Sequence, residues 1–171
     1  HVSVHGLSLE QEKVLFDIFT GEIFPVVTPM AIDPEKPFPF LGNLTSAMIV
    51  SLRGKGKKKK NFHAVVPLCR YGERIVRLPS QHGFDYVLRE EIAMKYAGHW
   101  FPGYDVVETG IFRVTRNADF AVAEEEAPDL ITGMNEVLED RKTGRCVRLE
   151  VENTTGAELT EMIRRGMEAD R

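Results

Sequence analysis

The chain has 171 residues and a mass of 19.3 kDa, the size of one domain or of two small domains that share a core. Its residues are 43% hydrophobic and 28% charged, with a mean hydropathy of −0.21, as in an ordinary soluble globular protein rather than a disordered or fibrous one. No apolar run approaches the roughly 18 residues of a membrane-spanning helix, so we expect no transmembrane segment.

The chain ends and the cysteines bear on origin and compartment. The sequence begins at His1 without a charged-then-apolar leader and stops inside a helix-like stretch, so we expect a piece of a longer, cytoplasmic protein. Cys69 and Cys146 are too few for a disulfide scaffold and too isolated for a metal cage, which favours reduced thiols. The histidines show no metal-ligand spacing and no nucleophile signature is present, so we expect neither a metal site nor catalytic residues.

Charge is distributed unevenly along the chain. The net charge is −4, from 22 basic and 26 acidic residues. Six basic residues fall within eight positions, at Arg53, Lys55 and 57–60, so the remaining 16 basic and 26 acidic residues carry a net charge of −10. Clustered lysines neutralise phosphate groups, but a charge run is more often the solvated tip of a hairpin. The sequence alone leaves both interpretations open.

The first elements predicted are a helix and a connector. Ser8 precedes acidic and amide side chains and then apolar residues at helical spacing, so we expect a helix that begins there and ends before Pro25. Five prolines within 24–40 fix the backbone and remove amide donors, which indicates a rigid, extended connector. The phenylalanines and valines of that segment predict that it lies on a core.

The next part of the sequence predicts a hairpin, a further strand and a helix. Residues 48–52 and 62–68 have strand composition and flank the lysine-rich loop, so we expect them to pair. Residues 74–78 alternate with a period of two, as in a third strand. A helix is predicted over 87–98, with its apolar residues on one side.

The last part predicts strands and helices in alternation. Residues 104–116 form one or two strands, and 124–142 form a helix whose acidic start suits the helix dipole. Val147, Leu149 and Val151 alternate as the inward side of another strand, and 158–167 form a last amphipathic helix. This order predicts an α+β fold, with helices packed on a mostly antiparallel sheet.

One polar cluster is a candidate binding site. Arg113 and Arg116 are followed by Asn117 and Asp119 at the end of a predicted strand. Two arginines in such a place can hold phosphate oxygens through bidentate hydrogen bonds. They can equally pair with local acids while Asn117 and Asp119 satisfy the backbone of a turn. The residues themselves do not decide between the two roles.

Several stretches of this sequence resemble a known family. They are, in chain order, Ile-Phe-Pro-Val-Val-Thr-Pro at 23–29, Ile-Asp-Pro at 32–34, Pro-Phe-Pro-Phe at 37–40 with Asn43, Phe-Pro-Gly at 101–103, Phe-Arg-Val-Thr-Arg-Asn-Ala-Asp at 112–119, three glutamates at 124–126 and Val-Arg-Leu-Glu-Val at 147–151. Their order and spacing are similar to those of type 1 polyphosphate kinase, the enzyme that extends inorganic polyphosphate from ATP. The resemblance covers nearly the whole chain.

The resemblance implies the middle, or head, domain of that enzyme. The implied organisation is a helical lead-in from the N-terminal region over 1–23, a proline-rich connector over 24–43 and the head domain over 44–171. The implied fold is α+β. In the family this domain is associated with dimer formation and with enclosing the polyphosphate channel. The phosphorylated histidine, the arginines around the ATP phosphates and the metal-binding residues belong to C-terminal domains of the family.

We therefore expect a non-catalytic fragment that acts in scaffolding, dimerisation and enclosure of the active-site channel. The parent enzyme would convert ATP and polyphosphate(n) to ADP and polyphosphate(n+1), with ATP and Mg as its cofactors, and this fragment would hold none. The expected partners are the rest of the parent chain and, through it, a second copy. The expected location is cytoplasmic, with peripheral membrane association open for the parent.

An alternative function is direct binding of polyphosphate or another polyanion. The candidate residues are Arg113, Arg116 and Asn117, with Lys57 and Lys58 from the lysine-rich loop. We do not expect a nucleic-acid partner, because the rest of the chain has a net charge of −10 and no aromatic residues for base stacking interrupt the lysines.

Overall fold

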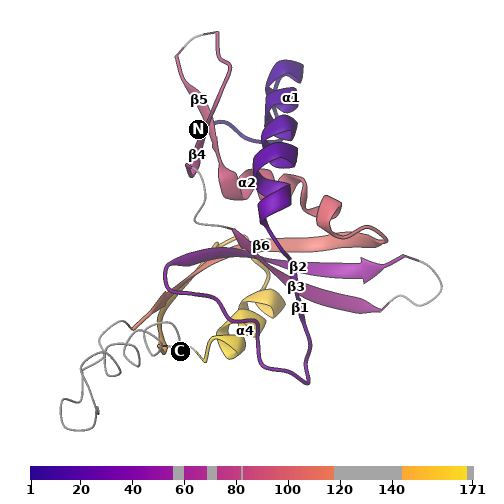
Figure 1. Cartoon of the computed structure of the whole chain (residues 1–171), viewed down its shortest axis with the longest axis vertical. Helices are drawn as coiled ribbons and strands as arrows, with labels where there is room; N and C mark the ends of the chain where they lie inside the picture. Colours follow the sequence, from indigo (N-terminus) through magenta and orange to yellow (C-terminus); the bar gives the residue numbers. More distant parts are fainter. Residues whose placement is uncertain (56–59, 69–72, 82, 118–143, 169–171) are drawn as a thin grey trace, which may run out of the picture.

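A five-stranded antiparallel sheet with the strand order β1-β3-β2-β6-β7 forms the centre of the computed structural model, and β4 and β5 pair separately (Figure 1). The structure describes residues 1–55, 60–68, 73–81, 83–117 and 144–168. The strands are β1 (Met30–Ile32), β2 (Thr45–Gly54), β3 (Asn61–Leu68), β4 (Ile75–Leu78), β5 (Asp85–Leu88), β6 (Tyr104–Arg116) and β7 (Cys146–Val151). The helices are α1 (Leu9–Ile18), α2 (Arg89–Lys95) and α4 (Ala157–Gly166), with π- and 3₁₀-helical turns η1 (Phe19–Ile23), η2 (Phe24–Val26) and η3 (Ala97–Trp100).

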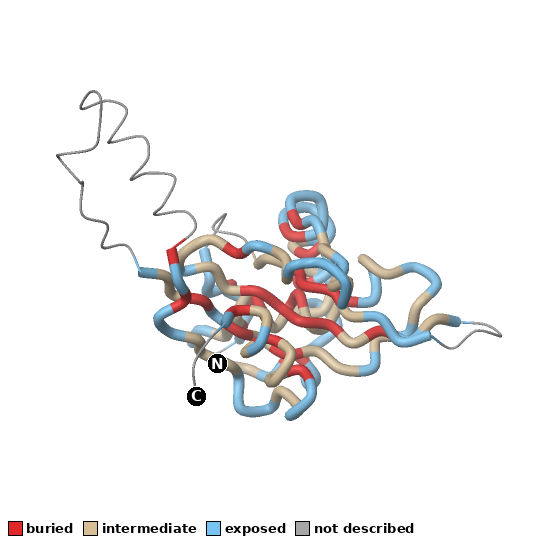
Figure 2. The backbone as a smooth tube through the Cα atoms, turned by 90° about the horizontal axis from the view of Figure 1, so that it is seen from below, coloured by how far each residue is buried: buried red, intermediate tan, exposed pale blue. Residues whose placement is uncertain are grey.

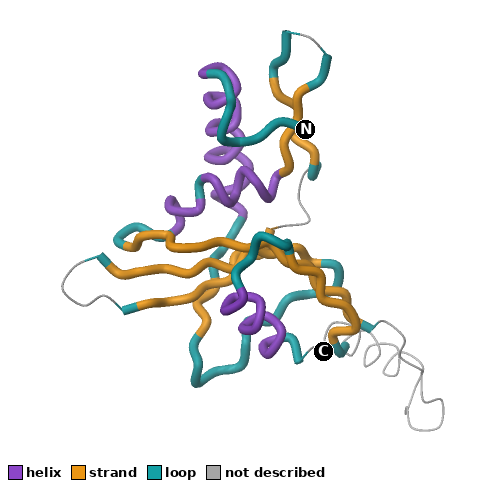
Figure 3. The backbone as a smooth tube through the Cα atoms, turned by 180° about the vertical axis from the view of Figure 1, so that it is seen from behind, coloured by secondary structure: helices purple, strands orange, loops and turns teal. Residues whose placement is uncertain are grey.

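Helices cover both faces of the main sheet, which confirms the predicted α+β fold. The helices α1 and α2 and the β4–β5 hairpin lie on one side of the sheet, and α4 lies on the other (Figure 3). Met48 and Val50 of β2 share a core cluster with Leu15 of α1, whereas Ile49 shares the second cluster with Ile163 of α4. Because successive strand residues point to opposite faces, β2 is buried without interruption over 47–50 (Figure 2).

The predicted first helix is confirmed. The Ser8 hydroxyl accepts the Gln11 N–H at 3.2 Å, and the Gln11 side chain accepts the Ser8 N–H at 3.0 Å, a reciprocal cap. The helical path then continues through η1 and η2 and includes Pro25, which stands in the first turn of η2, where a missing N–H is tolerated. The segment after it is more than a connector, because β1 pairs with β3 at the edge of the sheet.

The predicted hairpin is confirmed as β2 and β3, with Val50 opposite Ala64. Residues 56–59 of its tip, which include Lys57 and Lys58, lie outside the described residues. At the described ends of the tip, Lys55 Nζ lies 3.3 Å from Asp105 Oδ1, and Lys60 Nζ lies 5.5 Å from the centre of the Phe62 ring.

The start of the helix predicted over 87–98 is wrong. The helix predicted to begin at 87 begins at Arg89, because Val87 and Leu88 belong to β5, where they pair with Val76 and Ile75. Pairing between β4 and β5 therefore overrides the local helical pattern. The segment 104–116 is one continuous strand, β6, which follows β2 along its whole length. The helix predicted over 124–142 lies outside the described residues.

The inward side of β7 also differs from the prediction. A register shift opposite Thr115 and Arg116 leaves an extra residue, Val147, in β7. Such a bulge reverses which residues face the core on one side of it. Cys146 is consequently buried, whereas Val147 is 59% exposed.

The junction between β6 and α4 is tightly built. Glu108 of β6 accepts the Gly156 N–H at 2.6 Å, so a carboxylate from the neighbouring strand caps the N-terminus of α4 and satisfies one of its donors. Gly110 of the same strand lies directly against Thr155, since a Cβ at Gly110 would meet the Thr155 side chain at 2.4 Å. These contacts fix α4 on the face of the sheet that carries the second core cluster.

Candidate functional site

The two arginines of the sequence-predicted cluster lie on opposite faces of β6. Arg113 is exposed on the face that carries α2, and it pairs in register with Ser46 and Glu150. Arg116 lies three residues further along, on the face that carries α4, beside Leu41 of the second core cluster. A strand places residues three apart on opposite sides, so the two guanidinium groups do not converge on a single ligand.

The guanidinium of Arg116 is bound to the backbone. Its Nε donates to the Leu41 carbonyl at 2.7 Å and its Nη1 to the Gly144 carbonyl at 2.9 Å. The group also lies 4.8 Å from the centre of the Phe40 ring, and the Arg116 N–H donates to the Asn43 side chain at 2.8 Å. Arg116 thereby joins the loop before β2 to the start of β7.

Asn117 continues this junction, since its N–H donates to the Arg145 carbonyl at 2.9 Å. Asp119, Lys57 and Lys58 lie outside the described residues, so the structure does not place them relative to Arg113. Phosphate binding by this set of residues stays a prediction.

A cleft of about 540 Å³, the α2 cleft, opens between α2 and the strands β6 and β7, and Arg113 lines it. Its charged lining residues are His1, Arg74, Glu90, Glu91, Arg113, Glu150 and Glu152. Four carboxylates therefore stand against two arginines and a histidine, a balance that does not favour a polyanion.

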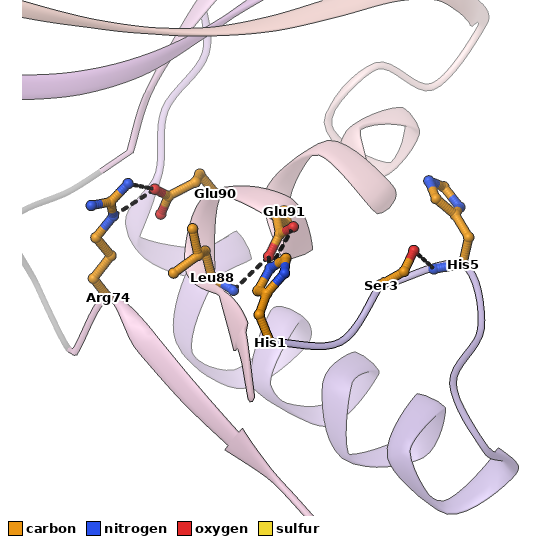
Figure 4. A network of polar contacts seen from close by, with 7 residues as sticks. All are labelled: His1, Ser3, His5, Arg74, Leu88, Glu90 and Glu91. Carbon is orange, nitrogen blue, oxygen red and sulfur yellow. Dashed lines mark hydrogen bonds and ion pairs between the residues drawn. The ribbon is translucent and has the colours of Figure 1, made fainter. Parts of the chain in front are cut away.

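Four charged side chains of the α2 cleft are paired with one another (Figure 4). Arg74 Nε donates to Glu90 at 2.6 Å, and this bond raises the pKa of the guanidinium further above its ordinary value. His1 Nε2 lies 2.8 Å from Glu91 Oε2, which also accepts the Leu88 N–H at 2.7 Å. These contacts bind the N-terminal segment and β4 to the start of α2.

A second hollow, of about 520 Å³, runs between β7 and α4, and we call it the β7–α4 groove. Its lining residues are Arg145, Cys146, Val147, Arg148, Leu149, Val151, Thr160 and Arg164. Three arginines from two elements line it, and no acidic residue is among the described lining. The sequence-based search missed these arginines as a group, because Arg164 is distant in sequence and only the fold brings it to β7.

Carboxylates outside the groove hold two of its arginines. Arg164 donates to Glu161 from Nε and from Nη2, each at 2.8 Å, and Arg148 Nη2 donates to Glu150 at 2.8 Å. Glu161 also accepts from Arg165 at 2.7 Å. The bonds from Arg164 and then Arg165 lower the pKa of Glu161 from 4.5 to about 2.

The lowered pKa of Glu161 predicts a contribution to stability that depends on pH. Because the folded state favours the ionised carboxylate, this contribution is complete above pH 4.5 and is lost as the pH falls towards 2. We expect a carboxyl ¹³C titration of Glu161 with a midpoint near 2, which moves up towards 4.5 in the double variant Arg164→Gln/Arg165→Gln. A midpoint that both substitutions leave in place would contradict the two hydrogen bonds.

The described residues contain neither a cluster of metal ligands nor a helix that could span a membrane. Among these residues, no three His, Cys, Asp or Glu side chains gather as they would around a metal ion. No described helix is both long and apolar enough to cross a membrane.

Comparison with known proteins identifies the family. The family model of the polyphosphate kinase middle domain matches residues 10–171. A polyphosphate kinase of Lactiplantibacillus plantarum is 37% identical over 153 residues, which are 90% of this chain and 21% of that protein. The polyphosphate kinase of Pseudomonas aeruginosa is 37% identical over 149 residues, 85% of this chain and 22% of that protein. The chain thus spans about a fifth of the length of these curated relatives.

A solved structure has the same fold. The crystal structure of polyphosphate kinase from Porphyromonas gingivalis matches 99% of this chain and 24% of its own, with a TM-score of 0.74 at 21% identity. The family model covers far more than half of the sequence, and the resemblance drawn from the motifs at 23–43 and 101–151 is confirmed. The chain therefore belongs to the polyphosphate kinase family and corresponds to its middle domain.

Proposed function

We propose that this chain serves a polyphosphate kinase as a non-catalytic middle domain, in scaffolding, in dimer formation and in enclosing the active-site channel. The whole enzyme would transfer the γ-phosphoryl group of ATP to the end of a polyphosphate chain, with ATP and Mg²⁺ held by other parts of it. The match to the middle domain over 10–171, at about a fifth of the relatives' length, is the observation that carries this proposal.

An exposed apolar surface supports the scaffolding role. Phe24 and Val26 of η2 are 41% and 50% exposed, and we call them the η2 surface. Phe24 is stacked on Trp100, with the ring centres 6.0 Å apart, and contacts the buried Phe19 ring at 5.7 Å. The surface therefore rests on a base of aromatic rings, the buried Phe19 and the half-buried Trp100. Exposed apolar residues gathered on such a base are typical of surfaces that bind another protein segment.

The non-catalytic role makes a direct prediction for the isolated chain. Incubated with ATP, Mg²⁺ and a polyphosphate primer, the 171-residue chain is expected to form no polyphosphate and no ADP above the background of a heat-denatured sample. The measurement is the release of ADP together with gel analysis of polyphosphate length. Turnover by the purified chain would overturn the proposal.

The scaffolding role predicts the behaviour of a chimeric enzyme. When this chain replaces the matching fifth of the Lactiplantibacillus plantarum enzyme, we expect polyphosphate synthesis to persist. In that chimera Val26→Glu is expected to lower synthesis at least tenfold, because a charge on the η2 surface would be buried against its neighbour. Leu9→Glu is the matched control, since Leu9 is 92% exposed and its position at the start of α1 favours an acidic residue. Equal activity of the two variants would count against the η2 surface.

Direct binding of a phosphate chain is the second candidate. The sequence assigns it to Arg113, Arg116, Asn117, Lys57 and Lys58, and that assignment remains a prediction. The observation that favours a binding role is a different one, namely the three arginines that line the β7–α4 groove.

A further inference from the structure

The β7–α4 groove combines cationic groups from two elements around one hollow. Arg145 directly precedes β7 and Arg148 lies in it, and Arg164 comes from α4 together with Thr160. Its volume of about 520 Å³ is within the range of about 300–1,000 Å³ that small-molecule sites occupy. The charged residues of the α2 cleft, which has a similar volume, are four carboxylates, two arginines and a histidine, so the two hollows differ in charge.

The fold brings these side chains together in two steps. The bulge at Val147 adds one residue between Arg145 and Arg148, and both arginines line the groove at the β7 end of the sheet. Thr160 and Arg164 are four residues apart on α4 and therefore lie on the same side of that helix. The cap from Glu108 and the close approach of Gly110 fix α4 in this position.

Two of the arginines are paired with carboxylates that line other hollows. Glu161 receives two parallel hydrogen bonds from Arg164 and lines a different hollow, beside the proline-rich segment. Glu150 receives one bond from Arg148 and lines the α2 cleft. A phosphate oxygen in the groove would replace these carboxylates as the partner of each guanidinium, so the carboxylates compete with the ligand. Planar guanidinium groups match the oxygen geometry of phosphate groups.

We propose that the β7–α4 groove binds a chain of inorganic phosphate groups through Arg145, Arg148 and Arg164. Successive phosphates would take successive arginines, because Arg145 and Arg148 lie three positions apart along one stretch of chain and α4 offers the third. The choice of polyphosphate as the ligand rests on the proposed function, whereas the anionic character of the ligand rests on the groove itself.

The test is a calorimetric titration of the full 171-residue chain with long-chain polyphosphate, carried out at two salt concentrations. We expect saturable binding whose log affinity falls with log salt at a slope of about −2, by analogy with three phosphate contacts on a single strand. Arg145→Gln, Arg148→Gln and Arg164→Gln are each expected to weaken binding about tenfold, as expected for the loss of one charge-assisted contact. Binding that the three substitutions leave unchanged overturns the proposal.

Two kinds of control variants make the result specific. Arg77→Gln is the control, because it removes one exposed positive charge from β4, outside the groove, and it is expected to change affinity less than twofold. Arg113→Gln removes a charge from the α2 cleft and tests the assignment made from the sequence. Glu161→Gln removes the negative partner of Arg164 and keeps the shape of the side chain, so it is expected to leave affinity unchanged or to raise it. A tenfold loss in Arg113→Gln with no loss in Arg148→Gln overturns the groove in favour of the α2 cleft. Unchanged circular-dichroism melting profiles show that each variant folds.

The choice of ligand and the proposed function are tested separately. ATP offers a chain of three phosphates on a nucleoside, and we expect it to bind at least tenfold more weakly than long-chain polyphosphate. Equal affinity for ATP overturns the assignment of the groove to inorganic polyphosphate. An active chimera whose isolated middle domain binds no polyphosphate rejects the groove and leaves the scaffolding role intact. An inactive chimera whose isolated middle domain binds polyphosphate rejects the scaffolding role and leaves the groove intact.

Discussion

Replacing Gly110 by alanine is expected to lower the free energy of unfolding by about 3 kcal/mol, because the new methyl group has no room. A Cβ at this position would lie 2.4 Å from both Cγ2 and Oγ1 of Thr155 and 2.9 Å from its Cβ. Gly110 pairs with Ile49 in the doubly covered part of the sheet, so the strand cannot move away without disturbing both cores. Urea unfolding followed by tryptophan fluorescence and circular dichroism measures the change.

The origin of that loss can be isolated by a second substitution. Thr155→Gly removes all three of the short contacts, so we expect the double variant Gly110→Ala/Thr155→Gly to recover more than half of the lost stability. The Thr155 hydroxyl is buried and has no hydrogen-bond partner among the described residues, so its removal sacrifices no such bond. Gly21→Ala is the control, because a Cβ there meets nothing within 4 Å. An unfolding midpoint for Gly110→Ala equal to that of the wild type would refute the close approach of β6 and α4.

The parts of the fold that the sequence predicted correctly are those with local causes. The first helix has its cap and its apolar spacing within one stretch, Ser8 to Phe19, and it forms where these signals place it. The β2–β3 hairpin is predicted by two adjacent runs of strand-forming residues around a polar loop. Neither element needs information from a distant part of the chain.

The parts that were missed depend on how the strands pair, which the local pattern does not contain. Val87 and Leu88 continue the helical pattern of α2 but are drawn into β5 by pairing with β4. Val147 continues the alternation of β7 but is turned outward by a bulge against β6. The apolar pattern of a single strand contains no signal for the register of its neighbour, so neither deviation could be foreseen.

The same distinction applies to the candidate sites. Arg113 and Arg116 formed a cluster in the sequence because they are three residues apart, and a strand separates such residues onto opposite faces. Arg148 and Arg164 share a groove although 16 positions separate them, because α4 returns along β7. Charge spacing along the chain therefore finds a site only where the residues share one face of one element.

Arg116→Met is the second substitution with a large expected effect, and it separates a structural role from a ligand-binding one. The variant leaves the carbonyls of Leu41 and Gly144 without their charged donor, in a place where both residues are buried. Hydrogen bonds to charged groups contribute about 1.5–3 kcal/mol each, and the contact with the Phe40 ring adds about 0.5 kcal/mol or more. Because these contributions overlap, we expect a loss of about 3 kcal/mol in the free energy of unfolding.

The control for Arg116 is its neighbour on the opposite face of β6. Arg113→Met removes the same charge and introduces the same side chain at an exposed position, so we expect a change within about 0.5 kcal/mol. Arg116→Lys keeps the charge, but a single ammonium group cannot donate to both carbonyls as the planar guanidinium does. The stability of this variant should therefore lie between those of the wild type and the methionine variant. Had Arg116 served a phosphate ligand instead, the methionine variant would keep its unfolding midpoint and lose affinity for polyphosphate. Denaturant unfolding of the three variants, combined with the polyphosphate titration, therefore assigns the residue to one role.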